Sequence, residues 1–359
     1  MRALALHGPL AIDAAIERPG GPLAIGDTVV GRILAHQPAM AGAFVALPRP
    51  GEEGFLPDTA TAARLPEGSH ARFRVTRGAQ GGKGPRLATL PATPEDGPTE
   101  GPVRLIARGP GAIERLATLH PGACIRVDRP GLAATLPQAL RARTSLGLGD
   151  EAERAADCWA ALEESTIMLA GGARFTITPT PALIAIDVDA GSATGERLSK
   201  KEAQLALNRR IIPAIARHIR LRNLSGAILV DPAGLPQRLR PQLAEVFRAA
   251  LAEDPLAPRF LGFSALGLAE IERRRTAPPL HDLLRGPHAE ALAGLAALAC
   301  ATEERPGAAP ALALAPDLLG ALEADEVARA EFRERTGRMP TLLAEPSLAA
   351  QSPHWRLVS

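Results

Sequence analysis

Three aspartates lie at the ends of two apolar segments. Asp187 and Asp189 end the segment 182–189, and Asp231 ends the segment 226–231 and is followed by Pro232. Side-chain direction alternates along a strand, so Asp187 and Asp189 share one face. Pro232 cannot continue a central ladder, which leaves Asp231 at the rim of the sheet. Magnesium is typically held by one or two carboxylates and a substrate phosphate, so the pattern predicts a magnesium site at which the three carboxylates converge.

A structural interpretation of the same aspartates stays open at this point. An aspartate at the end of a strand often caps a helix or solvates a turn, because its short carboxylate accepts hydrogen bonds from nearby backbone N–H groups. Two such ends on neighbouring strands, separated by a basic helix, favour the metal site. The two interpretations differ in whether the carboxylates are used by the chain itself or are left for a ligand.

The elements that must position these acids follow a strand, helix, strand order. Residues 173–178 and 182–187 form a predicted hairpin around a Pro-Thr-Pro turn, and a long helix over 199–222 leads to a buried strand at 226–231. This order places both acids at carboxyl ends of strands, where open α/β sheets bind ligands. Further along, the pattern predicts a helix to residue 252, a strand at 259–264 and a helix at 266–275.

The predicted helix 199–222 has an apolar and a basic face. It contains seven Lys/Arg and one acid, Glu202, and Pro213 is expected to kink it. One face carries Leu205, Ile211, Ile212, Ile215 and Ile219, and the other carries Arg209, Arg210, Arg217 and Arg220. The basic face is either an RNA-contacting surface near the acids or an ordinary solvated face.

Two further regions flank this part of the chain. Short predicted strands at 29–35, 43–47, 54–56, 70–77 and 86–90 suggest an OB-type barrel. A linker rich in proline and acids follows at 91–102, and a helix is expected at 150–164. The carboxyl-terminal part reads as two alanine-rich helices, with 339–343 and 355–358 able to pair as strands in a small α+β cap.

Composition narrows the class of protein without naming a substrate. The chain has 359 residues, 46% of them hydrophobic, which suggests two or three domains. The net charge is +2, and only three of the 41 Lys/Arg residues are lysine, which fits either phosphate recognition or a GC-rich genome. Three scattered cysteines support neither disulfides nor structural zinc. With no leader-like or membrane-spanning stretch, a cytoplasmic protein without membrane association is expected.

The acidic segments resemble the ribonuclease E/G family of bacterial RNA-processing endonucleases over residues 171–280. The stretches GGARFTITPTPALIAIDVDAGSATG and RHIRLRNLSGAILVD are similar to those that lead into the family's two catalytic aspartates. The resemblance implies that Asp187 and Asp231 are the metal ligands and that Asp189 stands where a supporting asparagine is found. It also implies RNA contacts from Asn208, from the neighbouring Arg209, and from basic residues of GFSALGLAEIERRR.

The predicted barrel resembles the S1-type RNA-binding domain of the same family, through VVGRILAHQPAMAGAFVAL and GEEGFLPD. Phe44 and Phe55 match its stacking aromatics, on which bases stack for roughly 1–3 kcal/mol each, and Lys83 adds a cation. In a small barrel a phenylalanine is also a common core residue, and this alternative stays open. Cations that are candidates to follow the phosphates are Arg32, Arg49, Arg72, Arg74, Lys83 and Arg86.

Between barrel and hairpin, LRART resembles the family's pocket for the 5′-monophosphate end of RNA, in which Arg143 and Thr144 are the phosphate-binding pair. The resemblance thus implies an amino-terminal segment (1–25), an S1-type OB barrel (26–92), a linker and sensor-like region (93–170), and an α/β, DNase I-like catalytic domain (171–285). A small α+β region (286–359) follows. The expected fold class is therefore multidomain, β and α/β.

The implied function is a Mg²⁺-dependent endoribonuclease that hydrolyses single-stranded RNA to 5′-phosphate and 3′-hydroxyl ends. The chain is shorter than the family pattern: Thr144 and Asp187 are 43 residues apart (187 − 144), which leaves no room for an RNase H-like subdomain. No CPxC zinc-link follows Leu280, so a monomer or dimer is expected in place of a zinc-tied tetramer. The alternative is an RNA-binding protein on the same scaffold that has lost turnover, because Ala190, Ser192 and Gly234 depart from the family pattern.

Overall fold

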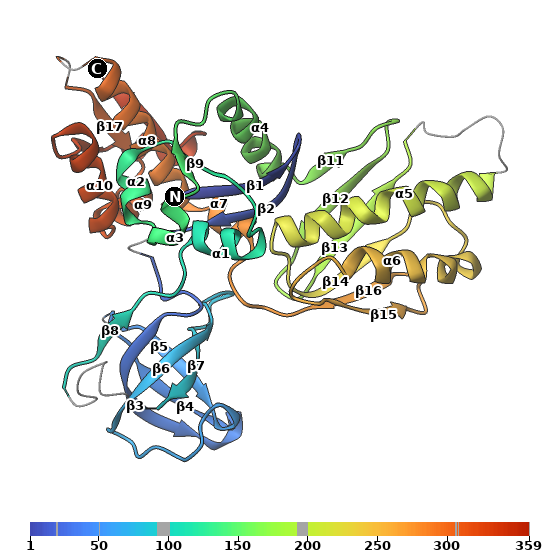
Figure 1. The fold of residues 1–359 in the computed structure, drawn as a ribbon, viewed down its shortest axis with the longest axis horizontal. Helices are drawn as coiled ribbons and strands as arrows, with labels where there is room; N and C mark the ends of the chain where they lie inside the picture. Colours follow the sequence, from blue (N-terminus) through green and yellow to red (C-terminus); the bar gives the residue numbers. More distant parts are fainter. Residues whose placement is uncertain are drawn as a thin grey trace. The chain divides into compact units, whose positions relative to one another are not determined.

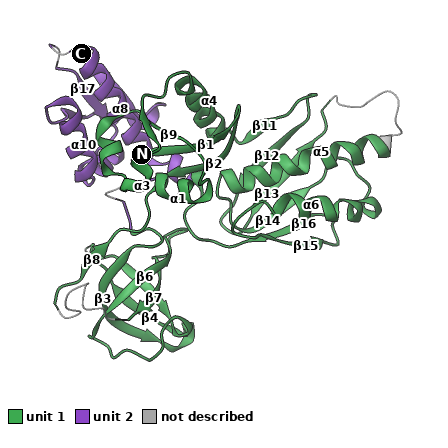
Figure 2. Cartoon of the chain, in the orientation of Figure 1, with its two compact units in different colours: residues 1–16, 23–280 green, residues 17–22, 281–359 purple. Residues whose placement is uncertain are grey.

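The computed structural model describes residues 1–18, 21–49, 51–91, 101–191, 200–305, 307 and 309–358. The chain divides into two compact units, shown in green and purple in Figure 2: residues 1–16 with 23–280, and residues 17–22 with 281–359. Within the described ranges, no helix combines the length and the apolar character that crossing a membrane requires. Most of the predicted linker and Ser192 lie outside the described residues.

A closed barrel forms the part of the first unit that follows its amino-terminal hairpin. Its strands are β3 (Thr28–Gln37), β4 (Gly42–Ala46), β5 (Glu53–Pro57), β6 (His70–Arg77) and β7 (Arg86–Leu90). They are ordered β4-β5-β7-β6-β3, and pairing between β3 and β4 closes the barrel, while β8 (Arg104–Ala107) adds to β3. Short 3₁₀ turns η1 (Pro38–Met40) and η2 (Asp58–Ala60) follow β3 and β5. The five-stranded barrel predicted from the sequence is confirmed and is consistent with an OB-type fold.

Small elements surround the amino terminus and the region after the barrel. They are the hairpin β1 (Arg2–His7) and β2 (Leu10–Ile16), α1 (Ala112–Leu119), β9 (Ile125–Val127), α2 (Pro130–Thr135), α3 (Gln138–Arg141), β10 (Thr144–Leu146) and α4 (Glu151–Glu163). The β1–β2 hairpin is antiparallel, whereas β9 and β10 pair in parallel. The helix expected at 150–164 is confirmed as α4, and the hairpin had not been predicted.

The same unit also contains a six-stranded sheet (Figure 1). Its strands, in spatial order, are β11 (Thr166–Met168), β12 (Arg174–Pro179), β13 (Ile184–Asp189), β14 (Gly226–Asp231), β16 (Ala269–Arg273) and β15 (Arg259–Phe263). Only β13 and β14 are parallel, because the crossover helix α5 (Lys200–Leu221) connects them. The turn η4 (Gln237–Leu243) and α6 (Ala244–Leu251) follow β14.

The two faces of this sheet differ because side chains alternate along each strand. Ile186 and Val230 belong to a buried core shared with Ile211 and Ile215 of α5 and with Phe247 of α6. The alternate positions point to the opposite face, which we call the acidic face; it carries the side chains of Asp187, Asp189, Asp231, Glu270 and Glu272. One face of the sheet is therefore closed by helices, and the other carries the candidate ligands.

The helix predicted at 266–275 is wrong, since residues 269–273 form strand β16, paired antiparallel with β14 and β15. Burial along β16 has a period of two: Ala269, Ile271 and Arg273 are buried, whereas Glu270 and Glu272 are more exposed. The long charged side chains of this segment suited a helix, but sheet pairing on both sides decided the outcome.

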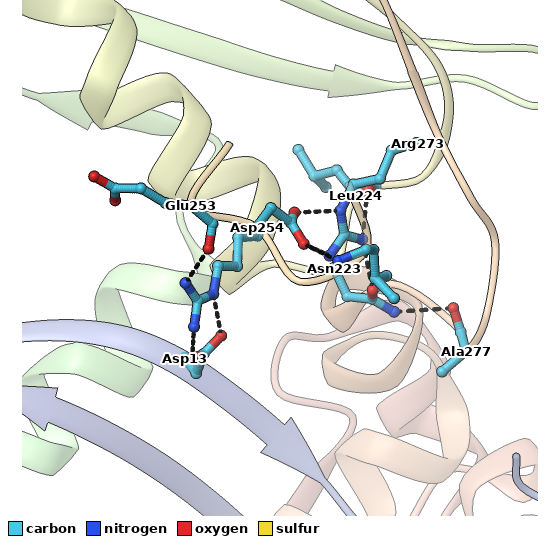
Figure 3. Close-up of polar contacts among 9 residues, drawn as sticks. Asp13, Asn223, Leu224, Glu253, Asp254, Arg273 and Ala277 are labelled. Carbon is cyan, nitrogen blue, oxygen red and sulfur yellow. Dashed lines mark hydrogen bonds and ion pairs between the residues drawn. The ribbon is translucent and has the colours of Figure 1, made fainter. Parts of the chain in front are cut away.

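Ion pairs fix the end of the sheet that is distant from the strand ends carrying the aspartates (Figure 3). Arg273 donates to Asp254 at 2.7 Å, with both side chains only 4% exposed, and to the side-chain oxygen of Asn223 at 2.8 Å. Arg220 of α5 pairs with Asp13 of β2 and donates to the Glu253 carbonyl at 2.8 Å. Arg273 is therefore a buried structural cation rather than a phosphate-facing one.

The second unit is built around a three-stranded sheet. Its elements are α8 (Pro287–Glu304), β17 (Ala311–Leu314), α9 (Pro316–Glu323), α10 (Glu326–Thr336), β18 (Leu342–Ala344), η5 (Pro346–Ala350) and β19 (Trp355–Val358), and α7 (Leu280–Leu284) precedes them. The strands expected at 339–343 and 355–358 do not pair with each other; β18 and β19 both pair with β17. Strand β17 was missed because its alanine and leucine residues read as helix.

Candidate functional site

The structure places Asp187 and Asp231 side by side. They are register partners in the parallel ladder between β13 and β14, and neighbouring strands lie about 4.8 Å apart. Both side chains project from the acidic face. The Asp187 residue is exposed, and the Asp231 side chain is 48% exposed. Two carboxylates from segments 44 positions apart (231 − 187) thus meet at one edge of the sheet.

The Asp187 carboxylate has no protein partner among the residues that the structure describes. Within the described part of the chain, no hydrogen bond or ion pair engages it, and neither it nor Asp231 accepts a backbone N–H. An aspartate that capped a turn would use exactly such a backbone donor, as Asp189 does with Gly191. The capping interpretation is therefore not supported at these two positions.

Arg240 is a site residue that the sequence did not reveal. Its Nη1 donates to Oδ1 of Asp231 at 2.8 Å and to the Gly267 carbonyl at 2.8 Å, and its Nε donates to the Leu235 carbonyl at 3.0 Å. The side chain is only 14% exposed. Arg240 therefore holds one oxygen of Asp231 in place and leaves the other oxygen available. No motif marked it, because its partners come from three separate segments.

Asn208 of helix α5 fixes the backbone that follows strand β14. Its amide donates to the Ala233 carbonyl at 3.0 Å and accepts from the Ala233 N–H at 3.0 Å, and it also donates to the Gln204 carbonyl at 2.8 Å. The residue is 2% exposed. The structure places Asn208 as a clamp on the turn after Asp231, and its polar atoms are not presented to an RNA strand.

Asp189 shares the face of Asp187 but has its own partners. Its carboxylate accepts from Arg174 at 2.6 Å and from the Gly191 N–H at 2.9 Å. The Gly191 hydrogen bond, followed by Arg174, lowers the pKa of Asp189 below its ordinary value. No group of three or more His, Cys, Asp or Glu side chains among the described residues is arranged to hold a metal. The expected convergence of three carboxylates is not found.

The basic face of helix α5 lies behind the sheet. Ile211 and Ile215 pack α5 against the face opposite Asp187. Arg209 and Arg210 are exposed, but they belong to this covering helix. Arg217 donates to the Ala11 carbonyl at 2.8 Å, and Arg220 pairs with Asp13, so these two cations hold the amino-terminal hairpin. Two of the four arginines on this face, Arg217 and Arg220, are therefore used by the fold, and an RNA contact stays a prediction for Arg209 and Arg210.

The predicted 5′-phosphate pair is occupied by the chain itself. Arg143 donates to the carbonyls of Pro121 and Ala123 at 2.6 and 2.8 Å, and more weakly to those of His120 and Ala117 at 3.3 and 3.2 Å. The Thr144 hydroxyl donates to the Leu140 carbonyl at 2.8 Å. Arg143 thus satisfies carbonyls at and beyond the end of α1, which leaves the guanidinium little capacity for a phosphate.

The barrel presents its two candidate aromatics on the outside. Phe44 and Phe55 are cross-strand partners with ring centroids 5.7 Å apart in an edge-to-face arrangement. Both are half-buried and lie outside the barrel core, which contains Phe73 instead. Lys83 is exposed in a turn closed by Gln80. Arg72, a candidate phosphate contact, is 2% exposed and belongs to the interior.

Comparison with known proteins places this geometry in a family. Residues 153–276 match the model of the Ribonuclease E/G family. Over this segment the chain is similar to the ribonuclease E/G family. It contains both strands that carry Asp187 and Asp231, together with Arg240 and β16. The family resemblance noted from the sequence is therefore confirmed for the part of the chain that holds the candidate site.

Individual relatives match about a third of the chain. The chain is 36% identical over 116 residues to Ribonuclease E of a Nostoc species, a match that covers 32% of this chain and 17% of that protein. It is 32% identical over 122 residues to Ribonuclease G of Escherichia coli, covering 34% of this chain and 25% of the relative. A Ribonuclease E/G-like protein of Pyropia yezoensis is 34% identical over 118 residues, or 33% and 23% of the two chains. The chain thus spans about a quarter or less of these relatives.

Proposed function

We propose that the chain is a magnesium-dependent endoribonuclease of the ribonuclease E/G type. It would hydrolyse single-stranded RNA and leave 5′-phosphate and 3′-hydroxyl ends. The observation that carries the proposal is the register of Asp187 with Asp231 on the acidic face of the sheet. The segment that contains them matches the model of the Ribonuclease E/G family, and the chain is similar to relatives named Ribonuclease E and Ribonuclease G, which gives the paired acids a chemical context.

The donor set fits a magnesium ion. Magnesium takes oxygen ligands, retains several waters, and is commonly bound by one or two carboxylates plus a substrate phosphate. Asp187 offers a carboxylate that no described residue engages, and Asp231 offers the oxygen that Arg240 does not hold. Bound there, magnesium would supply positive charge to the phosphate oxygens as the P–O bond breaks.

The remaining residues fix these two ligands and leave room for RNA. Arg240 sets the orientation of Asp231, and Asn208 clamps the following turn at Ala233. The Asp189 carboxylate lies two residues from Asp187 and is held in place by hydrogen bonds from Arg174 and the Gly191 N–H. A water molecule near the phosphate would donate to it and be oriented by it. These roles assign positioning to the chain and charge stabilisation to the ion.

In this proposal the barrel binds the part of the RNA that lies outside the cleavage site. The external pair Phe44 and Phe55 offers rings on which bases stack, and exposed Arg86 is the register partner of Phe55. Lys83 lies in the turn that precedes Arg86 along the chain. Single-stranded RNA is the natural substrate for such a surface, because its bases are free to leave their own stack.

Cleavage of a fluorescent single-stranded RNA in Mg²⁺ tests the proposal. Wild type is expected to cleave, and Asp187→Asn and Asp231→Asn to lose nearly all turnover while binding the RNA. Glu272→Gln is the matched control, since Glu272 is an exposed acid on the same face and pairs with Arg259 alone among the described residues. Equal cleavage by all four proteins would remove the active-site assignment.

The same assay separates the alternative function. Binding of RNA by wild type without any cleavage, over a range of Mg²⁺ and Mn²⁺ concentrations, would indicate an RNA-binding protein on a ribonuclease scaffold. Cleavage of a matched single-stranded DNA at an equal rate would instead contradict the choice of RNA as substrate.

A further inference from the structure

A short turn at the rim of the acidic face exposes an apolar side chain. Residues 264–268 connect β15 to β16, and Leu266 at its tip is 81% exposed. It is the most exposed large apolar side chain among the described residues; the next, Met168, is 62% exposed. A single exposed leucine is ordinary on a protein surface, so its exposure alone assigns nothing, and the surroundings of the turn decide.

The turn is held by internal hydrogen bonds. The Ser264 N–H donates to the Leu268 carbonyl at 2.9 Å, and the Gly267 N–H donates to the Ser264 carbonyl at 2.8 Å. The Ser264 hydroxyl accepts from the Leu268 N–H at 3.1 Å. Gly267 has a φ of +83°, a conformation that glycine adopts without strain. The backbone on both sides of Leu266 is therefore fixed, and the side chain projects from a rigid base.

Two side chains from the segment after β14 anchor this turn beside Asp231. The Gln237 amide donates to the Ala265 carbonyl, and Arg240 donates to the Gly267 carbonyl at 2.8 Å. The same nitrogen of Arg240 donates to Asp231 Oδ1 at 2.8 Å. The Gly267 carbonyl and the Asp231 carboxylate are thus at most two hydrogen-bond lengths apart. A Cβ at Gly267 would lie 3.0 Å from Cδ of Arg240, so the turn packs tightly on its anchor.

We propose that Leu266 is a specificity-determining residue that contacts the nucleobase beside the phosphate held at Asp187 and Asp231. This inference rests on the proposed function, since it assumes RNA at the acidic face. Apolar side chains such as leucine pack against or between bases when the strand is unstacked. A fixed leucine next to the reacting phosphate favours the strand positions where a base unstacks readily, and so selects where cleavage occurs.

The test maps cleavage sites on one heteropolymeric single-stranded RNA of known sequence, with wild type, Leu266→Ser, Leu266→Phe and the control Leu261→Ser. Leu261 lies on β15 of the same hairpin and is 52% exposed. Leu266→Ser is expected to lower kcat/KM by roughly tenfold and to flatten the distribution of cleavage sites. Leu266→Phe is expected to keep or sharpen that distribution, and Leu261→Ser to leave it unchanged.

The outcomes separate this inference from the proposed function. Cleavage by wild type with the same rate and the same map in Leu266→Ser would overturn the role of Leu266 and leave the active site intact. Absence of cleavage by wild type would instead contradict the proposed function. Light scattering on the same variants detects the remaining possibility, because a change of mass in Leu266→Ser would show that Leu266 contacts a second copy of the chain and would overturn the base contact.

Discussion

The candidate metal pair, Asp187 and Asp231, and the candidate 5′-phosphate pair, Arg143 and Thr144, were both predicted from a resemblance in sequence, but their surroundings in the structure differ. Asp187 has no partner among the described residues, and Asp231 has one oxygen held by Arg240. Arg143 and Thr144, in contrast, donate hydrogen bonds to backbone carbonyls of the chain. A polar side chain is available to a ligand only where the fold has not already satisfied it. The comparison favours the acidic pair as a site and the Arg-Thr pair as a structural brace.

The largest expected effect comes from the unpartnered member of the metal pair. Asp187→Asn should lower cleavage by at least about a hundredfold, since metal-based charge stabilisation is worth several kcal/mol. The free energy of unfolding should change by less than about 0.5 kcal/mol, because Asp187 is exposed and makes no hydrogen bond or ion pair with the described residues. Steady-state cleavage and urea unfolding measure the two quantities. A large loss of stability would show that Asp187 is a structural residue after all.

The stability of the fold should depend on pH through His218, a buried residue of helix α5. Burial, with Arg217 and Arg222 nearby, lowers the pKa of His218 from 6.5 to about 3. The unfolded chain then binds a proton that the folded chain does not, so stability is complete above pH 6.5 and falls as the pH decreases toward 3. The loss should be of the order of a few kcal/mol.

Unfolding free energies measured between pH 4 and pH 8 test this slope. His218→Gln should flatten it, whereas the control His7→Gln, at an exposed position, should not. An unchanged slope in His218→Gln would show that other groups account for the acid sensitivity of the fold.

Arg143→Ala should lower stability and leave the 5′-phosphate preference of cleavage unchanged, whereas Asp187→Asn should lower cleavage and leave stability unchanged. Removing the guanidinium removes its hydrogen bonds to several carbonyls around the end of α1, which should cost roughly 1 kcal/mol in stability because the carbonyls of Pro121 and Ala123 are exposed and can bind water instead. The ratio of cleavage rates on 5′-monophosphate and 5′-hydroxyl RNA should stay as in wild type. A loss of 5′-phosphate preference with unchanged stability would show that Arg143 binds the 5′-phosphate and is not a structural residue.

The smallest effect is expected on the outside of the barrel. Phe55→Ala should weaken RNA binding by about 1–2 kcal/mol, because one stacking ring is removed, and should alter the barrel core little. Fluorescence anisotropy with a short single-stranded RNA measures it. Phe73→Ala is the contrasting variant, since Phe73 is fully buried in the barrel and its truncation should act on folding.

Much of the scaffold could be predicted from the sequence because local patterns and tertiary packing agree there. The five barrel strands, α4, α5 and the strands ending at the aspartates were all predicted close to their observed positions. Segment 266–275 failed because its charged, helix-compatible residues are held as a strand by β14 and β15. Strand β17 failed for the related reason that Ala311–Leu314 has no alternation to show, being buried throughout.

The sequence by itself determined that two aspartates end two apolar strands and that a family of ribonucleases shares these segments. Only the tertiary structure decided that Asp187 and Asp231 are register partners, because register depends on how α5 returns the chain to the sheet. It also decided which acceptors of the chain each arginine engages, since Arg240, Arg273 and Arg143 differ only in the oxygen atoms that packing brings to them. Residue type sets what a side chain can bind, and packing sets what is left for it to bind.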